Sequence, residues 1–305
     1  MKKILVTGGT VFVSRYVAEY CATRGHEVFV LNRGTKTQPP GVSLIKCDRH
    51  SIGDKLRNIR FDAVVDVTAY DARDIVDLTG ALGDCGAHVM ISSSAVYPET
   101  GAQPFREESP LGPNKFWGEY GVGKILAERE LQERFPGAYI LRPPYLYGEM
   151  NNVYREAFVF ECAEKKRPFF LPKDGAMRLQ FFHVRDLCRF IDVVLEKRPE
   201  RHVFNVGNND PITVKDWAAL CYRIVGRKPE YVGVHEDVEQ RNYFSFYDYE
   251  YRLDVENQHA MMPETTSLED GLERAYAWYR GNREKVGVKP FIAYIDENFG
   301  RIPKL

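Results

Sequence analysis

The 305-residue chain has none of the sequence features that mark membrane-spanning, secreted or zinc-binding proteins. No apolar stretch approaches the ~20 residues needed to cross a bilayer, and the apolar run at residues 4–6 ends before Gly8, too soon for a signal peptide. The six cysteines include no Cys-x-x-Cys pair, and the seven histidines show no metal-ligand spacing. These absences predict a cytoplasmic protein with no disulfide framework, no metal site and no membrane partner.

An excess of charge of one sign is also absent. The 42 basic and 43 acidic side chains give a formal net charge of −1, whereas affinity for nucleic acid rests largely on basic surface that neutralises phosphates. The short basic run at residues 165–167 follows Glu161 and Glu164, which is typical of a solvated helix end. The charge balance therefore argues against nucleic acid as a partner.

The chain does contain a regular alternation of strand and helix patterns. Short apolar runs typical of buried strands lie at residues 4–6, 28–31, 63–67, 88–91 and 139–141. Segments between them, including residues 120–134, have helical spacing of their apolar residues. This alternation predicts an α/β protein with a parallel sheet covered by helices on both faces.

After residue 144 the alternation loosens, and local signals predict the remaining elements. A helix is expected over residues 184–195 and a short strand over 203–206. Thr213 and Ser267 each precede a helical pattern and have an acidic residue three positions later, the spacing of a capping box. The aromatic segment at residues 243–251 is interpreted as packing of the core and lobe.

A glycine-rich turn, TGGTVFVS at residues 7–14, joins the first predicted strand to the following helix. In that position a turn lets backbone N–H groups and the N-terminus of the helix approach a pyrophosphate. Taken alone, such a turn is a weak signal for a bound dinucleotide.

Tyr120 and Lys124 form a second motif. Because they stand four residues apart on a predicted helix, their side chains lie on one face. An ammonium group beside a phenol favours the phenolate and lowers its pKa from about 10, although the same spacing also occurs in ordinary surface pairs. Ser93 strengthens the motif, since it follows a predicted strand 27 positions before Tyr120.

In combination these motifs resemble the short-chain dehydrogenase/reductase superfamily, specifically its extended branch, the NAD-dependent epimerase/dehydratase family. Other segments typical of that branch follow in the same order, at residues 127–128, 142–143, 147–148, 182–187 and 205–208. The resemblance therefore covers residues 1 to about 210. The resemblance implies a doubly wound Rossmann domain that binds the dinucleotide over residues 1–147, to which residues 178–206 return. A smaller C-terminal lobe, mostly residues 148–305, would bind the substrate.

The resemblance also implies the chemistry. Tyr120 would act as the acid/base on a hydroxyl or carbonyl oxygen, Lys124 would lower the pKa of Tyr120 and hold the nicotinamide ribose, and Ser93 would donate a hydrogen bond to the same oxygen. The residues expected at the dinucleotide are Gly8, Thr10, Val11, Phe12, Val13, Asn32, Arg33, Asp48, Thr68, Ala69, Lys124 and Pro143.

The position that selects the cofactor follows the second predicted strand. NAD-selective folds place an acid there to hold the ribose 2′-hydroxyl, whereas a nearby arginine suits a 2′-phosphate. This chain has Asn32 at the acid position and Arg33 beside it. The pair favours NADP over NAD, although a solvated arginine in a turn is an alternative interpretation.

The chain also departs from the family's pattern. Val11 and Ser14 replace the second and third glycines of Gly-x-x-Gly-x-x-Gly, and Leu179 stands where sugar-nucleotide enzymes carry an arginine that grips the diphosphate. Ser94 follows Ser93 where a 4,6-dehydratase has an acidic pair, which argues against that reaction. The sequence does not distinguish an epimerase reaction from a reductase reaction.

Two hypotheses follow. The first is an NAD(P)-dependent oxidoreductase or epimerase acting on a hydroxyl or carbonyl of a sugar, a sugar nucleotide or a related small molecule. The alternative is a non-catalytic dinucleotide-binding regulator or RNA-binding protein, because the turns also look like those of an atypical branch that includes chloroplast stem-loop RNA-binding proteins. The retained Ser93, Tyr120 and Lys124 favour the enzyme. A homodimer through the helix that bears Tyr120 is left open, since many relatives pair there.

Overall fold

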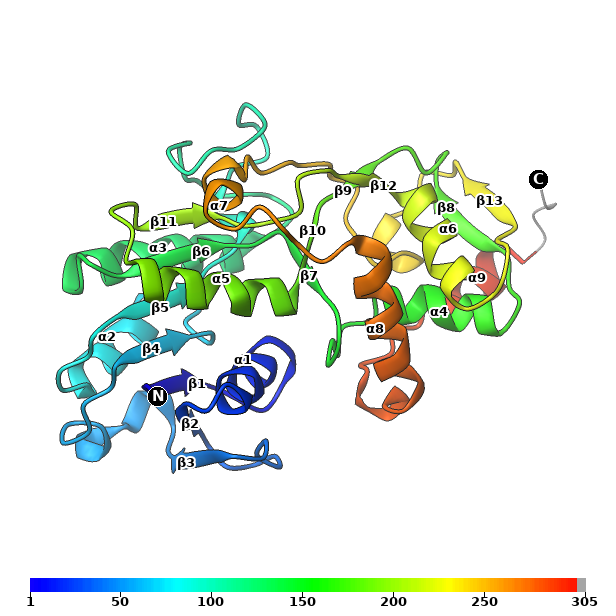
Figure 1. Cartoon of the computed structure of the whole chain (residues 1–305). Coiled ribbons are helices and arrows are strands. Elements are labelled where there is room, and N and C mark those ends of the chain that lie inside the picture. Colours follow the sequence, from blue (N-terminus) through cyan, green and yellow to red (C-terminus); the bar gives the residue numbers. More distant parts are fainter. Residues whose placement is uncertain (301–305) are drawn as a thin grey trace.

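A seven-stranded parallel sheet forms the centre of the molecule (Figure 1). The structure, a computed structural model, describes residues 1–300. The strand order is β11-β6-β5-β4-β1-β2-β3, and every neighbouring pair is parallel. These strands are β1 (Lys3–Thr7), β2 (Glu27–Asn32), β3 (Val42–Lys46), β4 (Ala63–Asp66), β5 (His88–Ile91), β6 (Tyr139–Arg142) and β11 (Val203–Asn205). The predicted α/β, doubly wound fold is confirmed.

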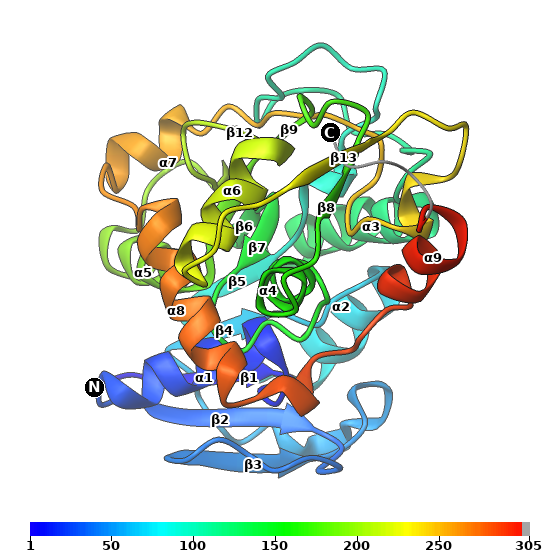
Figure 2. The same cartoon turned by 90° about the vertical axis from the view of Figure 1, so that its right-hand side faces the viewer.

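Helices cover both faces of this sheet. They are α1 (Phe12–Thr23), α2 (Ala72–Ala81), α3 (Gly118–Arg134) and α5 (Val184–Lys197). Successive side chains of a strand point to opposite faces, so Ile4 and Val6 of β1 pack in one core with α1 and α5, whereas Leu5 packs in another with α2. Figure 2 shows α1 and α5 on one side of the sheet and α2 and α3 on the other.

The strand order reverses at β1. β2 and β3 extend from it in one direction, and β4, β5 and β6 extend in the other. Because the strands are parallel, their C-terminal ends meet at one edge, where Gly8, Thr68, Ser93 and Pro143 follow β1, β4, β5 and β6 within two residues. Ligands of doubly wound sheets bind outside this edge at the reversal point. The fold therefore gathers these four residues where a ligand is expected.

The C-terminal lobe, on the right in Figure 1, surrounds an aromatic core. Its strand pairs are β7 (Tyr145–Tyr147) with β10 (Phe181–His183), β8 (Phe169–Pro172) with β13 (Tyr231–Val234), and β9 (Arg178–Leu179) with β12 (Ile212–Thr213). Its α-helices are α4 (Glu156–Glu164), α6 (Val214–Ile224), α8 (Leu268–Arg280) and α9 (Phe291–Asn298). The short helix α7 (Glu256–Met261) lies instead beside β11 of the sheet. The 3₁₀ turns of the chain are η1 (Arg49–Ser51), η2 (Gly53–Lys55), η3 (Ser94–Val96), η4 (Gln240–Asn242) and η5 (Arg283–Lys285).

Two helix starts in the lobe follow the predicted capping pattern. The hydroxyl of Thr213 accepts a hydrogen bond from the backbone N–H of Asp216 at 3.0 Å, and that of Ser267 accepts one from Asp270 at 3.0 Å. Each satisfies an N–H group that the first turn of the helix leaves unpaired. The starts of α6 and α8 predicted from the sequence are confirmed.

Residues 184–205 return to the sheet after the first lobe strands. α5 packs with α1, and β11 pairs with β6. The division of the chain into two domains stays a prediction, and residues 301–305 of the predicted lobe lie outside the described residues. Within residues 1–300 no helix is both long and apolar enough to cross a membrane, and no three His, Cys, Asp or Glu side chains group as metal ligands.

Candidate active site

The turn after β1 depends on its two glycines. Gly8 and Gly9 both have a φ of +83°, in the left-handed region that favours glycine. A Cβ atom on Gly8 would lie 2.9 Å from Cγ2 of Thr68 and 3.0 Å from Oγ of Ser14, and one on Gly9 would lie 2.5 Å from Cγ1 of Val30. The turn therefore passes so close to its neighbours that a side chain at either glycine would displace it.

The N-terminus of α1 follows this turn without a capping side chain. Val11 is the N-cap residue, with an extended backbone (φ −137°, ψ 135°) that any residue adopts, and its side chain makes no capping hydrogen bond. The first N–H groups of a helix need partners from outside the helix, so those of α1 are available to an anionic ligand. The hydroxyl of Ser14, at the third glycine position, donates to the carbonyl of Val11 at 3.0 Å and stabilises the turn.

Ser93 and Tyr120 come together from β5 and α3. The Ser93 hydroxyl accepts a hydrogen bond from the backbone N–H of Ala95 at 3.2 Å, because Ser93 caps η3. Its own hydrogen is therefore free to donate, and a polar interaction with the Ser93 side chain acts to lower the pKa of the Tyr120 phenol. Tyr120 stands in the first turn of α3. The structure thus joins the two side chains that the sequence paired across 27 positions.

The pKa of Tyr120 differs from the sequence-based expectation. Tyr120 is 42% exposed as a whole, yet protein surrounds it closely enough that desolvation is the largest influence, and this raises the pKa above its ordinary value of 10. The polar interaction with Ser93 and the positive charge of Arg155 act in the opposite direction. The expected lowering of the Tyr120 pKa by Lys124 is not seen, because the Lys124 ammonium is directed to other groups.

Lys124 lies almost fully inside the protein, with 2% of its surface exposed. Its Nζ donates to the carbonyl of Ala69 at 2.7 Å and to that of Ile91 at 2.8 Å, and it lies 5.8 Å from the centroid of the Tyr120 ring. Burial lowers the pKa of Lys124 to about 8, although the charges of nearby carboxylates, Asp66 first, oppose this. Lys124 therefore links the end of β5 to the loop after β4 beneath Tyr120.

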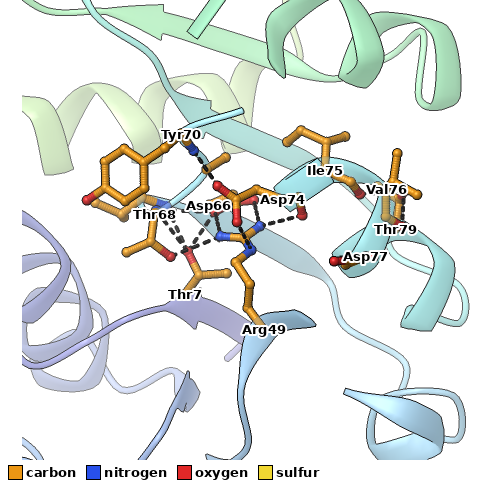
Figure 3. A network of polar contacts seen from close by, with 12 residues as sticks. Thr7, Arg49, Asp66, Thr68, Tyr70, Asp74, Ile75, Val76, Asp77 and Thr79 are labelled. Atoms are coloured by element: carbon orange, nitrogen blue, oxygen red, sulfur yellow. Dashed lines mark hydrogen bonds and ion pairs between the residues drawn. The ribbon is translucent and has the colours of Figure 1, made fainter. Parts of the chain in front are cut away.

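The loop after β4 is held by a buried ion-pair network around Arg49 (Figure 3). Arg49 reaches from η1, and its guanidinium contacts Asp66 Oδ2 at 2.7 Å, Asp74 Oδ1 at 3.1 Å and Thr68 Oγ1 at 3.0 Å. Asp66 is fully buried and also accepts from the hydroxyl of Thr7 at 2.7 Å. Although burial opposes it, Arg49 holds the pKa of Asp66 below its usual range.

The same network fixes the backbone of residues 67–71. The Thr7 hydroxyl accepts from the N–H of Val67 and of Thr68, and Asp74 Oδ2 accepts from the N–H of Tyr70 at 2.7 Å. Ala69, whose carbonyl receives the Lys124 ammonium, lies within this loop. Arg49 thus supports the backbone that positions Lys124.

A cavity of about 740 Å³ connects the glycine turn to Ser93, Tyr120 and Lys124. Ten of the residues predicted for the site line it: Gly8, Thr10, Val11, Phe12, Val13, Thr68, Ser93, Tyr120, Lys124 and Pro143. Its volume suits a ligand held largely inside the protein. The turn and the Ser-Tyr-Lys group therefore border one space.

Four of the residues predicted for the site do not line this cavity. Ala69 is buried and contributes its backbone carbonyl to Lys124. The Asn32 amide donates to the carbonyl of Gly8 at 2.6 Å, and its oxygen accepts from the N–H of Gly34, so this side chain ties the first turn to the end of β2. Arg33 is exposed, and Asp48 accepts from the N–H of His50 at the start of η1.

Sequence reasoning missed the lobe side of the cavity. Trp117, Tyr145, Arg155, Tyr247 and Tyr251 also line it. The aromatic segment at residues 243–251 therefore contributes to the cavity wall as well as to packing. Nothing in the local sequence distinguishes Arg155 from the other arginines, since its neighbours in space come from distant elements.

The chain is similar to known proteins in both sequence and fold. The model of the NAD dependent epimerase/dehydratase family matches residues 4–207. The chloroplast stem-loop binding protein of 41 kDa b from Arabidopsis thaliana is 27% identical over 278 residues, which cover 84% of this chain and 72% of the relative.

The solved structures share the fold at lower sequence identity. An epimerase from Methanothermobacter thermautotrophicus has a TM-score of 0.76 at 20% identity and covers 93% of each chain. A UDP-glucuronic acid 4-epimerase from Bacillus cereus, in complex with UDP-glucuronic acid and NAD, has a TM-score of 0.71 at 18% identity over 92% of this chain and 99% of the other.

Proposed function

Because the chain belongs to the NAD-dependent epimerase/dehydratase family, we propose that it is an NAD(P)-dependent oxidoreductase or epimerase of a sugar or sugar nucleotide, with Ser93, Tyr120 and Lys124 as its active site. The observation that carries the proposal is the single cavity of about 740 Å³ lined by both the glycine turn and these side chains. A dinucleotide held at the turn would share this space with a substrate at Tyr120. The UDP-glucuronic acid and NAD of the Bacillus cereus structure support this choice of ligands.

The residues around the turn fit a dinucleotide. Gly8 leaves no Cβ between the turn and Thr68, and the uncapped N-terminus of α1 offers N–H groups to a pyrophosphate. When bound, the nicotinamide ring supplies or accepts a hydride. Thr10, Val11 and Phe12 would lie along the phosphates, and the buried ammonium of Lys124 would hold the nicotinamide ribose.

Tyr120 would transfer the proton. Its phenol gives a proton to a substrate carbonyl oxygen, or takes one from a hydroxyl, as the substrate is reduced or oxidised. Ser93 would donate a hydrogen bond to the same oxygen. The positive charge of Arg155 would favour the phenolate when Tyr120 has lost its proton, since it opposes the rise that desolvation causes in the pKa of Tyr120.

The cofactor preference is a finer part of the proposal. We infer that Arg33 favours NADP, since its exposed guanidinium has no ion pair among residues 1–300 and could pair with a 2′-phosphate. The Asn32 amide, by contrast, already bridges to Gly8 and would not select either cofactor strongly. Titration of wild type and Arg33→Ala with NAD and NADP tests this, and tighter binding of NAD by wild type would contradict it.

RNA binding is the second candidate function. It is favoured by the similarity to a chloroplast stem-loop binding protein over 84% of this chain. The net charge of −1 opposes it, because RNA affinity depends on neutralising phosphates.

Identification of the bound ligand tests the proposal most directly. The purified protein is denatured, and the released small molecules are identified by mass spectrometry, while cofactor fluorescence is followed during titration with NADH and NADPH. The proposal predicts a dinucleotide with saturable binding. If neither cofactor binds and no dinucleotide is released, the enzymatic proposal is wrong.

A further inference from the structure

Two arginines of the lobe form no ion pair with a described carboxylate: Arg155 lines the cavity that holds Tyr120, and Arg241 lines a neighbouring cavity. Arg155, which precedes α4, donates to the carbonyl of Leu146 at 3.3 Å, and Arg241, in η4, donates to the carbonyl of Ser245. Neither forms an ion pair with any described residue. The charge of Glu239 acts on Arg241, but no described carboxylate lies within ion-pair distance of either guanidinium. A half-buried guanidinium without an ion pair leaves strong donors open to an anion.

Aromatic rings connect the two guanidinium groups. Arg155 lies 5.0 Å from the centroid of Tyr145, and Arg241 lies 4.8 Å from that of Tyr247. Trp117 stands between these rings, with its centroid 6.1 Å from Tyr145 and 5.2 Å from Tyr247. The two charges therefore border one aromatic wall.

A second cavity begins where this wall ends. It has a volume of about 470 Å³, is lined by Arg241, and shares Phe116 and Tyr247 with the cavity that holds Tyr120. The carboxylates of Glu236, Glu239 and Asp248 also line it, but Asp248 is paired with Lys173 at 2.9 Å. The two cavities therefore adjoin at Phe116 and Tyr247, with Arg155 in the lining of one and Arg241 in the lining of the other.

Tyr145 provides an independent sign of a ligand. It lines the cavity, is 4% exposed, and its hydroxyl has no hydrogen-bond partner among the described residues. A buried hydroxyl without a partner destabilises a fold, so such groups are normally satisfied by a ligand or by water. The Tyr145 hydroxyl belongs to the ring against which Arg155 packs.

The position at which family members carry their diphosphate-gripping arginine cannot serve here. Leu179 occupies it and is buried with 1% exposure, and the adjacent Arg178 is exposed and lines neither cavity. A positive charge for a substrate phosphate must therefore come from elsewhere in the lobe.

We propose that Arg155 and Arg241, with the hydroxyl of Tyr145, bind a phosphoryl group of the substrate. The inference rests on the proposed function, because it places the substrate sugar at Tyr120 and its phosphate toward the lobe. A phosphoryl group suits the site better than a carboxylate, since it has enough oxygens to accept hydrogen bonds from both guanidinium groups and from the phenol. The phosphate could belong to a sugar phosphate or to a nucleoside diphosphate sugar whose nucleoside extends into the second cavity.

The test is calorimetric binding of four probes to the full chain with saturating dinucleotide, in a Tyr120→Phe background that prevents turnover. The probes are glucose, glucuronate, glucose 1-phosphate and UDP-glucose. We expect both phosphorylated probes to bind at least about 10-fold more tightly than glucose, and Arg155→Gln or Arg241→Gln to weaken them roughly 10- to 100-fold. Arg155→Lys should recover part of the loss, and Arg178→Gln should change nothing.

The outcomes separate this inference from the function on which it rests. If the dinucleotide binds but both arginine variants keep the wild-type affinity for phosphorylated probes, the inference alone is wrong. Tighter binding of glucuronate than of glucose 1-phosphate, or no binding of any phosphorylated probe, also overturns it. Failure of dinucleotide binding overturns the proposed function instead. Equal affinity for the two phosphorylated probes would show that the two arginines recognise the phosphate alone. A clear preference for UDP-glucose would show that the nucleoside also binds, in the second cavity.

Discussion

At the scale of single residues, the buried ammonium of Lys124 is the most unusual group in the site. Its two carbonyl partners satisfy two of its three N–H donors, and burial brings its pKa to about 8, compared with 10.5 for an exposed lysine. Between these two pH values the folded chain has lost a proton that the unfolded chain still holds. The contribution of Lys124 to the free energy of unfolding therefore rises with pH across this window.

Lys124→Met should remove that rise. Denaturant unfolding of the apo protein from pH 8 to pH 10.5 should show the stability of wild type increasing relative to the variant, by about 3 kcal/mol in total. Comparison with the variant cancels the titration of the buried tyrosines, which both proteins share. The exposed Lys228→Met serves as the control and should follow wild type. Parallel pH profiles of wild type and Lys124→Met would contradict the low pKa.

Tyr120→Phe should abolish turnover while leaving the fold and the dinucleotide affinity nearly unchanged. Only the phenolic oxygen can transfer the proton, and the ring remains to pack, so we expect kcat to fall on the order of 10²–10⁴-fold. Tyr70→Phe is the matched control, because its ring lies 6.4 Å from that of Tyr120 and lines the same cavity. A far smaller loss is expected there. Near-wild-type activity of Tyr120→Phe on the true substrate would exclude the assigned role.

At the scale of elements, the loop between β4 and α2 depends on a side chain from η1. Arg49 pairs with Asp66 and Asp74 where both carboxylates are almost fully buried. Removing one partner of a buried ion pair leaves an uncompensated charge. We expect Arg49→Met to lower the free energy of unfolding by about 3–5 kcal/mol.

Arg57→Met is the matched control for this prediction. Arg57 pairs with Asp54, and both side chains are mostly exposed, so its loss should change the free energy of unfolding by less than about 1 kcal/mol. Urea unfolding of wild type, Arg49→Met and Arg57→Met measures the three free energies of unfolding that this prediction compares. Equal stability of Arg49→Met and Arg57→Met would show that the buried network does not hold the loop.

The start of α1 gives a second prediction at this scale. Val11 caps the helix with an extended backbone, so glycine is not needed there for its conformation, and its side chain lines the cavity. Val11→Gly should tighten dinucleotide binding because it opens the approach to the N–H groups of α1. Added chain entropy of about 0.5–1 kcal/mol opposes folding, but glycine is a better N-cap than valine, so apo stability should change little.

Thermal melts and cofactor titrations of Val11→Gly and Val13→Gly check this expectation. Val13 also lines the cavity but lies within α1, so glycine there should lower the melting temperature without improving affinity. Weaker binding by Val11→Gly would mean that the valine is part of the phosphate site and that the family's usual contacts do not apply to this turn.

At the scale of the whole molecule, the balance of charge bears on the two candidate functions. The chain has 42 basic and 43 acidic side chains, and several of its surface arginines are paired with carboxylates, as in the pairs of Arg24 with Asp192 and Arg283 with Glu164. We expect no mobility shift of a structured RNA at physiological salt. A shift that weakens steeply with added salt would instead support the RNA-binding alternative.

Several features of the candidate site could be predicted from the sequence because their signals are local. The turn at Gly8, the four-residue spacing of Tyr120 and Lys124, and the position of Ser93 after a strand all depend on short stretches of chain, and the structure brings these residues to one cavity. Their catalytic roles stay a prediction. The pKa of Tyr120 was expected in the wrong direction, since desolvation of a side chain depends on elements that its own helix does not contain.

Local signals in the sequence were enough to specify the alternation of strands and helices, the capped starts of α6 and α8, and the edge of the sheet at which the turn residues gather. The spacing of apolar residues and the capping of helices both depend on a few neighbouring residues. Because the strands are parallel, the turns that follow them meet at one edge of the sheet. The packing of distant elements, by contrast, brings Arg49 to the loop that positions Lys124, and places Arg155 and Arg241 against one aromatic wall. Such contacts join elements that are far apart in the chain. The distances between these elements depend on the crossover connections and on the packing of the lobe, and neither leaves a pattern in the local sequence.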